Sequence, residues 1–242
     1  MKKRHSAYLL LSSCLLSASL FASGLYHQHH TLVTKQVQAS YTPAQVLTRL
    51  KAGNARFLAD KGHSTNHLNK ALYTAKKGQH PLAIVLNCVD SRSIANYIFD
   101  EDIGSIFVAR VAGNVADPNI LGSMEFAAIH AGVKVIVVMG HTHCGAVAAA
   151  CHGQATGTPA LDQLLKQIQP AVKIVRQQEG RSFSCNDANT INSIAKQNVL
   201  DQIQYILIHS PDIARLVHDK KIIIVGAMHD IKTGKVRFFD EK

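Results

Sequence analysis

Two thiols and an imidazole in this 242-residue chain have the types and spacing of a metal site. Cys88 directly follows the apolar run 81–87, and His141-Thr-His-Cys144 directly follows a second apolar run, 133–140. Thiolate and imidazole are the ligands that zinc prefers, and three protein ligands leave the fourth tetrahedral position open, as catalytic zinc sites do. We therefore predict that Cys88, His141 and Cys144 bind one Zn²⁺ per chain.

Two alternatives stand beside this prediction. His143 competes with His141, but in an extended turn its side chain points away from the Cys144 side, which favours His141. A disulfide between Cys88 and Cys144 would need only an oxidising compartment. The presence of a histidine at the end of a second strand favours the metal over the disulfide.

The run Cys88-Val-Asp-Ser-Arg92 adds a carboxylate and a guanidinium close to the first thiol. Two thiolates cancel the formal charge of Zn²⁺. Such a zinc therefore lowers the pKa of a bound water less than a zinc with three neutral ligands does. Asp90 would accept a hydrogen bond from that water and orient it, and Arg92 would fork onto Asp90 and keep it ionised. The alternative is an ordinary surface ion pair between Asp90 and Arg92 at the end of a strand. Because the pair follows a predicted metal ligand, we predict instead that both residues are catalytic.

The elements that must position these residues alternate between strands and helices. Short apolar runs of strand length stand at 81–88, 105–111, 133–140 and 222–227, with an edge strand at 236–239. Helices are expected from Pro43 with Thr42 as N-cap, over 118–130, from Gly145, over 161–178 with a kink at Pro170, over 188–209 and from Pro211. This order predicts an α/β fold with a mainly parallel central sheet flanked by helices, in which ligands bind at the carboxyl ends of the strands.

The N-terminus has the pattern of an exported protein. Three basic residues precede an apolar run and then small residues near 22–24, so residues 1–24 are predicted as a signal peptide. An uncleaved anchor and a lipoprotein site at Cys14 are the alternatives. Residues 25–41 are expected to be a flexible tether and 42–242 a single catalytic domain, located in the periplasm or secreted, with no stable membrane insertion after cleavage.

Composition excludes some classes of protein. With 47% hydrophobic and 17% charged residues the chain is globular and not disordered. Removing 1–24 takes away three basic residues and no acidic one, so the formal charge falls from +10 to +7. No basic block or aromatic interleaving marks a nucleic-acid site, so no nucleic-acid partner is expected.

The two signature runs, Cys88-Val-Asp-Ser-Arg92 and His141-Thr-His-Cys144-Gly145, resemble the motifs of bacterial β-class carbonic anhydrases. The resemblance extends over 42–239. It implies zinc-dependent, reversible hydration of carbon dioxide to bicarbonate and a proton, by attack of a zinc-bound hydroxide that the Asp-Arg pair orients. It also implies a homodimer or homotetramer, and substrate-binding roles for Gln79, Phe107 and Gly145.

The chain departs from some members of that family. A bicarbonate-dependent allosteric site in those members uses Trp, Arg and Tyr; here Arg110 matches the Arg, no Trp exists, and His229 stands at the Tyr position. The resemblance thus implies the non-allosteric, open-site form with Asp90 off the metal, the alternative being that Asp90 ligates zinc at low pH. Phe126 stands where many members carry Tyr.

Two thiols and two other functions stay open. Cys151 and Cys185 match no zinc motif, and they are either paired with each other or, for Cys151, a small buried hydrophobe. A zinc-binding or redox protein without turnover is one rival function, which Asp90 and Arg92 argue against. A zinc lyase acting on another small substrate such as carbon disulfide would use the same ligands.

Overall fold

Short runs rich in β-branched residues form one five-stranded sheet in the computed structural model, which describes residues 32–62 and 66–239. The strand order is β2-β1-β3-β4-β5. The strands are β1 (Ala83–Asn87), β2 (Ile106–Arg110), β3 (Val135–His141), β4 (Ile223–His229) and β5 (Val236–Phe238). The first four are parallel and β5 pairs antiparallel with β4, so the prediction of a mainly parallel sheet is confirmed. β1 and β3 are buried along their whole length, as strands covered on both faces are.

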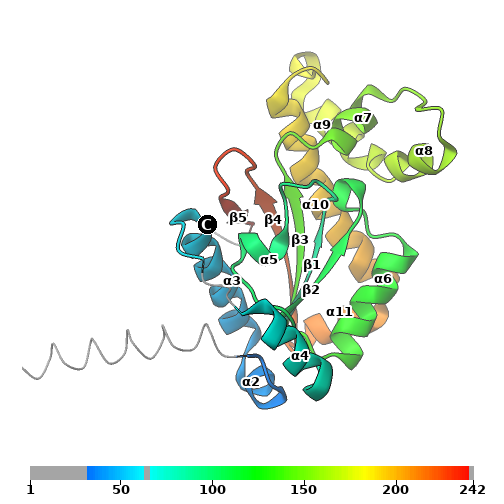
Figure 1. Ribbon diagram of the computed structural model, residues 1–242. Helices are drawn as coiled ribbons and strands as arrows, with labels where there is room; N and C mark the ends of the chain where they lie inside the picture. Colours follow the sequence, from blue (N-terminus) through cyan, green and yellow to red (C-terminus); the bar gives the residue numbers. More distant parts are fainter. Residues whose placement is uncertain (1–31, 63–65, 240–242) are drawn as a thin grey trace, which may run out of the picture. The chain divides into compact units, whose positions relative to one another are not determined.

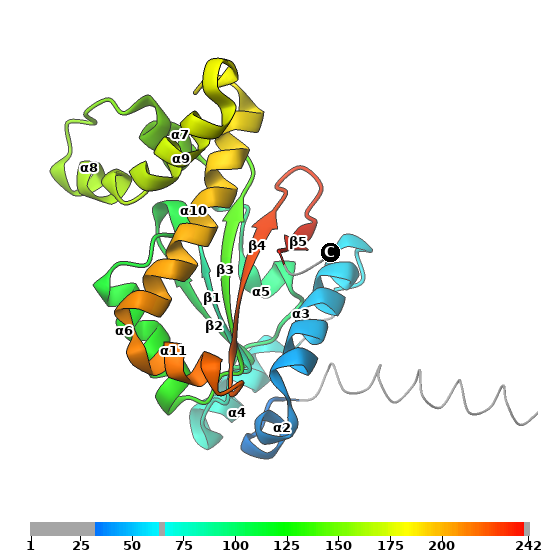
Figure 2. The ribbon, with the colours of Figure 1, turned by 180° about the vertical axis from the view of Figure 1, so that it is seen from behind.

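Helices cover both faces of the sheet (Figures 1 and 2). Alternate residues of β3 point to opposite faces, so Val137 joins one core and Val138 the other. The first core includes residues of α2 (Lys35–Ser40), α3 (Pro43–Leu58) and α5 (Ala95–Ile98). The second includes residues of α6 (Pro118–Glu125), the π-helical turn Phe126–His130, α10 (Ala188–His209) and α11 (Pro211–His218).

A third core lies beyond the carboxyl ends of the strands, where Figure 1 shows three further helices. They are α7 (Gly145–His152), α8 (Pro159–Lys166) and α9 (Gln169–Glu179). Val147, Leu165 and Val172 come from these helices and pack with Ile194 of α10. α4 (His67–Lys77), which has no buried residue, completes the set of α-helices in the described ranges.

Helix boundaries follow local chemistry. Thr42 caps α3 in a capping box with Gln45, as the sequence predicts for the N-cap. Two helices stand where one was expected over 161–178: the first ends at Lys166 and the second begins at Gln169. Pro170 lies in the first turn of α9, where a proline's missing N–H costs no helical hydrogen bond.

The tether expected over 25–41 ends earlier than predicted. Val33 is buried, and Thr34 caps α2. The Gln38 side chain donates from Nε2 to the carbonyls of Pro81 (2.7 Å) and Ala131 (2.8 Å), which fixes α2 to the loops before β1 and β3. From Val33 onward the chain forms one compact unit. The signal peptide predicted for 1–24 and the first part of the tether lie outside the described residues.

No helix within 32–62 or 66–239 is long and apolar enough to cross a membrane.

Candidate metal centre

The three predicted ligands meet at the carboxyl edge of the sheet. Cys88 directly follows β1, His141 is the last residue of β3, and Cys144 is the N-cap of α7. Because β1 and β3 are parallel neighbours in register, their ends lie side by side. The three ligand atoms all lie within 4.8 Å of one another, and all three residues are buried. The structure therefore brings together the residues that the sequence singled out.

The donor atoms fit a zinc ion. Two thiolates on one tetrahedral zinc, at a bond length of about 2.3 Å, stand about 3.8 Å apart; the Cys88 and Cys144 sulfurs are 4.0 Å apart. His141 Nδ1 lies 2.9 Å from the Thr142 carbonyl, which can only accept, so Nδ1 holds the proton. His141 Nε2 is buried and has no hydrogen-bond partner. Its lone pair is thus free for a metal, in the tautomer that metal-ligating histidines adopt.

The surroundings of the Cys88 thiol favour its negative charge. The Gly113 amide donates to Cys88 Sγ over 3.4 Å. The hydrogen bond between the two thiols is the largest cause that lowers the pKa of Cys88, and the same bond raises the pKa of Cys144. Cys144 caps the first turn of α7, where free amides stabilise an anion.

Asp90 and Arg92 form a two-pronged ion pair beside the cluster. Arg92 Nε donates to Asp90 Oδ1 (3.0 Å) and Nη2 donates to Oδ2 (2.8 Å), while the Arg92 amide also donates to Oδ1. These bonds hold the pKa of Asp90 well below its usual range. Asp90 Oδ2 lies 4.0 Å from His141 Nε2, so an ionised carboxylate borders the ligand atoms.

Three comparisons with known proteins bear on this site. Residues 83–236 match the family model described as carbonic anhydrase. Carbonic anhydrase 2 of Mycobacterium tuberculosis is 30% identical over 196 residues, covering 80% of this chain and 91% of its own length. The carbonic anhydrase of Mycolicibacterium smegmatis is 30% identical over 197 residues, covering 80% and 92%.

Solved structures of β-carbonic anhydrases have a fold similar to that of this chain. The β-carbonic anhydrase CcaA superposes with a TM-score of 0.66 at 26% identity, covering 81% of this chain and 95% of its own. A tetrameric β-carbonic anhydrase of Sordaria macrospora superposes with a TM-score of 0.63 at 25% identity, covering 81% and 98%. The chain belongs to the β-carbonic anhydrase family.

His143 and His229 of this β-carbonic anhydrase take no part in the cluster. His143 is exposed and adopts a positive φ of 55°, and its backbone amide donates to Asn192 Oδ1. His229 is buried and pairs in register with His141, and burial lowers its pKa to about 4, so it is neutral near pH 7. The choice of His141 over His143 is consistent with this geometry.

Arg110 has a role that the sequence did not reveal. Its guanidinium donates from Nε to the Cys88 carbonyl (3.1 Å) and from Nη2 to the Asp90 carbonyl (2.7 Å). Arg110 ends β2 opposite Asn87 in register, so it reaches the loop that follows β1. It thereby fixes the backbone between the first ligand and the Asp90 carboxylate. The strand-end position of Arg110 was a usable signal for this contact.

The three expected substrate-binding residues do not come together in one chain. Gly145, the first residue of α7, follows Cys144 and has nothing within 4 Å of where a Cβ would be. Gln79 precedes β1 and Phe107 lies within β2; both line a hollow of about 590 Å³ to which none of the three ligands belongs. Phe126, at the family's frequent Tyr position, lines the same hollow.

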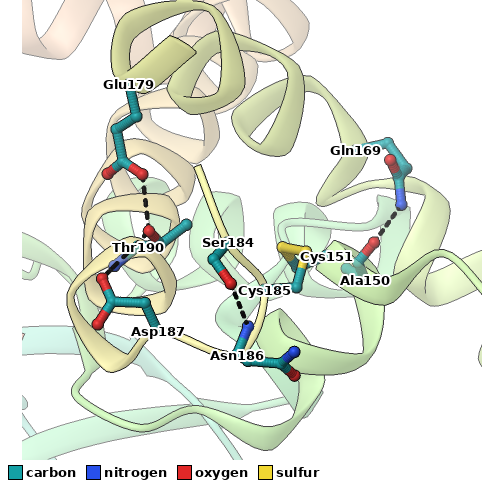
Figure 3. Close-up of a disulfide and its surroundings, with 9 residues drawn as sticks. All are labelled: Ala150, Cys151, Gln169, Glu179, Ser184, Cys185, Asn186, Asp187 and Thr190. Atoms are coloured by element: carbon teal, nitrogen blue, oxygen red, sulfur yellow. Dashed lines mark hydrogen bonds between the residues drawn. A yellow bond between two sulfur atoms is a disulfide. The ribbon is translucent and has the colours of Figure 1, made fainter. Parts of the chain in front are cut away.

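A disulfide joins Cys151 near the end of α7 to Cys185 in the loop before α10 (Figure 3). The sequence left this pairing open. Gln169 adds a hydrogen bond from Nε2 to the Ala150 carbonyl, 2.6 Å long. α7, which Cys144 caps, is therefore tied at its far end to α9 and to the loop before α10.

Proposed function

We propose that this protein is a zinc-dependent carbonic anhydrase that catalyses the reversible hydration of carbon dioxide to bicarbonate and a proton. The observation that carries the proposal is the Asp90–Arg92 ion pair beside a buried Cys₂His set. A structural zinc site has no use for such a pair, whereas three protein ligands leave one position for chemistry.

Cys88, His141 and Cys144 would hold the zinc, which supplies Lewis acidity that lowers the pKa of a water ligand toward neutrality. Asp90, kept ionised by Arg92, accepts a hydrogen bond from water entering the site and so orients its lone pair toward carbon dioxide. The Gly145 amide in the first turn of α7 offers a donor to the bicarbonate anion.

The open-site form, with Asp90 off the metal, is part of this proposal. Its support is that both carboxylate oxygens of Asp90 are engaged by Arg92. Arg110, the match to the Arg of the allosteric site, is instead committed to the backbone of the Cys88–Asp90 loop.

Assembly and location complete the proposal. We propose a homo-oligomer, supported by the tetrameric relative from Sordaria macrospora. Phe126 is an exposed apolar side chain whose ring lies 6.2 Å from that of Phe107 on the edge strand β2, the kind of surface that a second copy covers. We propose export to the periplasm or beyond, supported by the signal-like pattern at 1–24 and by the Cys151–Cys185 disulfide, since disulfides persist in oxidising compartments.

Stopped-flow hydration of carbon dioxide by the zinc-loaded protein tests the proposal, with bound zinc measured in the same samples. Asp90→Asn should lower kcat about a hundredfold or more while zinc stays bound. Asp212→Asn is the matched control, because Asp212 also pairs with an arginine, Arg215, but on the exposed face of α11. A wild-type protein with one zinc per chain and no hydration activity between pH 6 and 9 would refute the function.

A further inference from the structure

α10 carries two buried amide side chains, Asn198 and Gln202, that face a loop of the metal centre. The two are one helical turn apart and therefore lie on one side of the helix. Asn198 is completely buried and Gln202 is 4% exposed. The polar atoms of a buried carboxamide need hydrogen-bond partners, so these partners show which segment of the chain the two side chains hold in place.

The partners belong to the loop that follows β2. Asn198 Nδ2 donates to the Gly113 carbonyl (2.8 Å), and Gln202 Oε1 accepts from the Ala116 amide (2.8 Å). Gln202 Nε2 donates to Asn198 Oδ1 (3.2 Å), which joins the two side chains. The loop is thus pinned at two points by a continuous chain of hydrogen bonds from one helix.

The same loop reaches the first ligand. Gly113 receives the Asn198 bond at its carbonyl and donates its own amide to Cys88 Sγ. Its φ is +68°, a backbone conformation that favours glycine, and a Cβ there would displace Ile168 Cδ1, which would stand 2.6 Å away. One residue therefore links Asn198 to the Cys88 sulfur.

α10 is also packed directly on the strand that carries the second ligand. A Cβ on Gly140, the residue before His141, would stand 2.9 Å from Val199 Cγ2 and 3.4 Å from the Ala195 carbonyl. The helix backbone and β3 hence approach closely one residue before His141. The close packing fixes α10 relative to His141. A side chain on α10 that holds the loop next to Cys88 can therefore set the position of Cys88 relative to His141.

We propose that Asn198, supported by Gln202, is a positioning residue of the metal centre: it holds Gly113 so that the Gly113 amide donates to Cys88 Sγ, and this bond strengthens retention of zinc. The identity of the metal rests on the proposed function. Loss of a residue that orients a metal ligand by a hydrogen bond typically weakens metal affinity about 10–100-fold.

The test compares Asn198→Leu with Thr190→Val in the zinc-loaded protein. Leucine keeps the branching of asparagine at Cγ, in a larger side chain, and has no donor for the Gly113 carbonyl. Thr190 is a matched control, because it is also a buried polar residue of α10. Its hydroxyl bonds Glu179 and Asp187 (Figure 3), neither of which belongs to the Gly113 loop. The readouts are zinc release to excess EDTA and the thiolate-to-metal charge-transfer band of the cobalt-substituted protein.

Asn198→Leu should release zinc about tenfold faster than wild type and shift the charge-transfer band, while Thr190→Val leaves both unchanged even if it unfolds at lower urea. Gln202→Met, which keeps the shape of the side chain, should act in the same direction with a smaller effect; it decides the matter if Asn198→Leu does not fold. Wild-type release rates and bands in the folded variants, or an equal acceleration in Thr190→Val, would overturn the proposal. None of these readouts measures catalysis. A zinc-loaded wild type without hydration activity would therefore refute the proposed function but not the positioning role of Asn198.

Discussion

At the scale of single residues, the two-pronged contact of Arg92 with Asp90 is the one on which the proposed catalytic role of the metal centre depends. Two parallel N–H···O bonds fix the carboxylate in a plane, and Lys, as a point charge, cannot reproduce that geometry. Arg92→Lys therefore keeps the charge and removes the orientation. We expect kcat to fall about ten- to a hundredfold with zinc content unchanged, measured by stopped-flow hydration. Arg215→Lys, in the exposed pair with Asp212, should keep full activity; an unimpaired Arg92→Lys would mean that the charge alone suffices.

The two ligand thiols also make a prediction about metal removal. Their sulfurs are 4.0 Å apart, within easy reach of the roughly 2 Å bond of a disulfide, and both residues are free cysteines. Apoprotein treated with the oxidant diamide should lose two hydrogen atoms per chain by mass spectrometry, with the new cross-link between Cys88 and Cys144. Zinc should protect both thiols, so the same treatment of the loaded protein should leave the mass unchanged. Equal oxidation of both forms would contradict assignment of these sulfurs to the metal.

At the scale of elements, a buried ion pair fastens α3 to the chain after α5. Arg49 Nε and Nη2 donate to the two oxygens of Glu101 over 2.6 and 2.8 Å, and the side chains are 4% and 0% exposed. Glu101→Gln leaves the Arg49 charge buried without a counter-charge and should lower the free energy of unfolding by about 3–5 kcal/mol. Urea denaturation measures this. The double variant Arg49→Met/Glu101→Leu should recover most of the loss, because replacing both charges removes the desolvation penalty.

The disulfide is the second fastening between elements, and it closes a loop of 34 residues that contains α8 and α9. Loop-closure entropy for that length corresponds to about 3–4 kcal/mol. Cys151→Ala/Cys185→Ala should therefore lower the free energy of unfolding by about 3 kcal/mol in zinc-loaded protein. Dithiothreitol should bring wild type to the stability of the double variant and leave the double variant unaffected. A variant as stable as wild type would show that the packing of α7 on α9 and α10 suffices.

The elements that sequence patterns could predict are those long or apolar enough to have a pattern. The strands follow from β-branched runs, and α10 from its 22-residue length. α2 was missed because six residues give no periodicity, and its anchor, Gln38, bonds carbonyls 43 and 93 residues away. The cluster of Cys88, His141 and Cys144 was predictable because its members stand at or shortly after the ends of two strands. Gly113 was not, because its contribution is a backbone amide, and Asn198 lies 85 residues from it.

At the scale of the whole molecule, one chain does not by itself unite the expected site. Gln79 precedes β1 and Cys88 follows it, so the strand separates them, and Phe107 lies on edge strand β2. These two side chains can serve the metal centre only if a second copy presents its β2 edge to the first. The exposed Phe126 beside them gives that edge the apolar character of a contact between copies.

Complementation between two inactive variants tests this arrangement. Asp90→Asn and Gln79→Leu chains carrying different tags can be co-expressed and purified as mixed dimers. If Gln79 acts across the interface, one of the two sites in each mixed dimer combines an intact Asp90 with the partner's intact Gln79, and the other site combines both defects. Activity should then recover to about half of wild type, although each variant alone is nearly inactive. If Gln79 served its own chain, each site would carry one defect and the mixed dimers would stay as inactive as the separate variants.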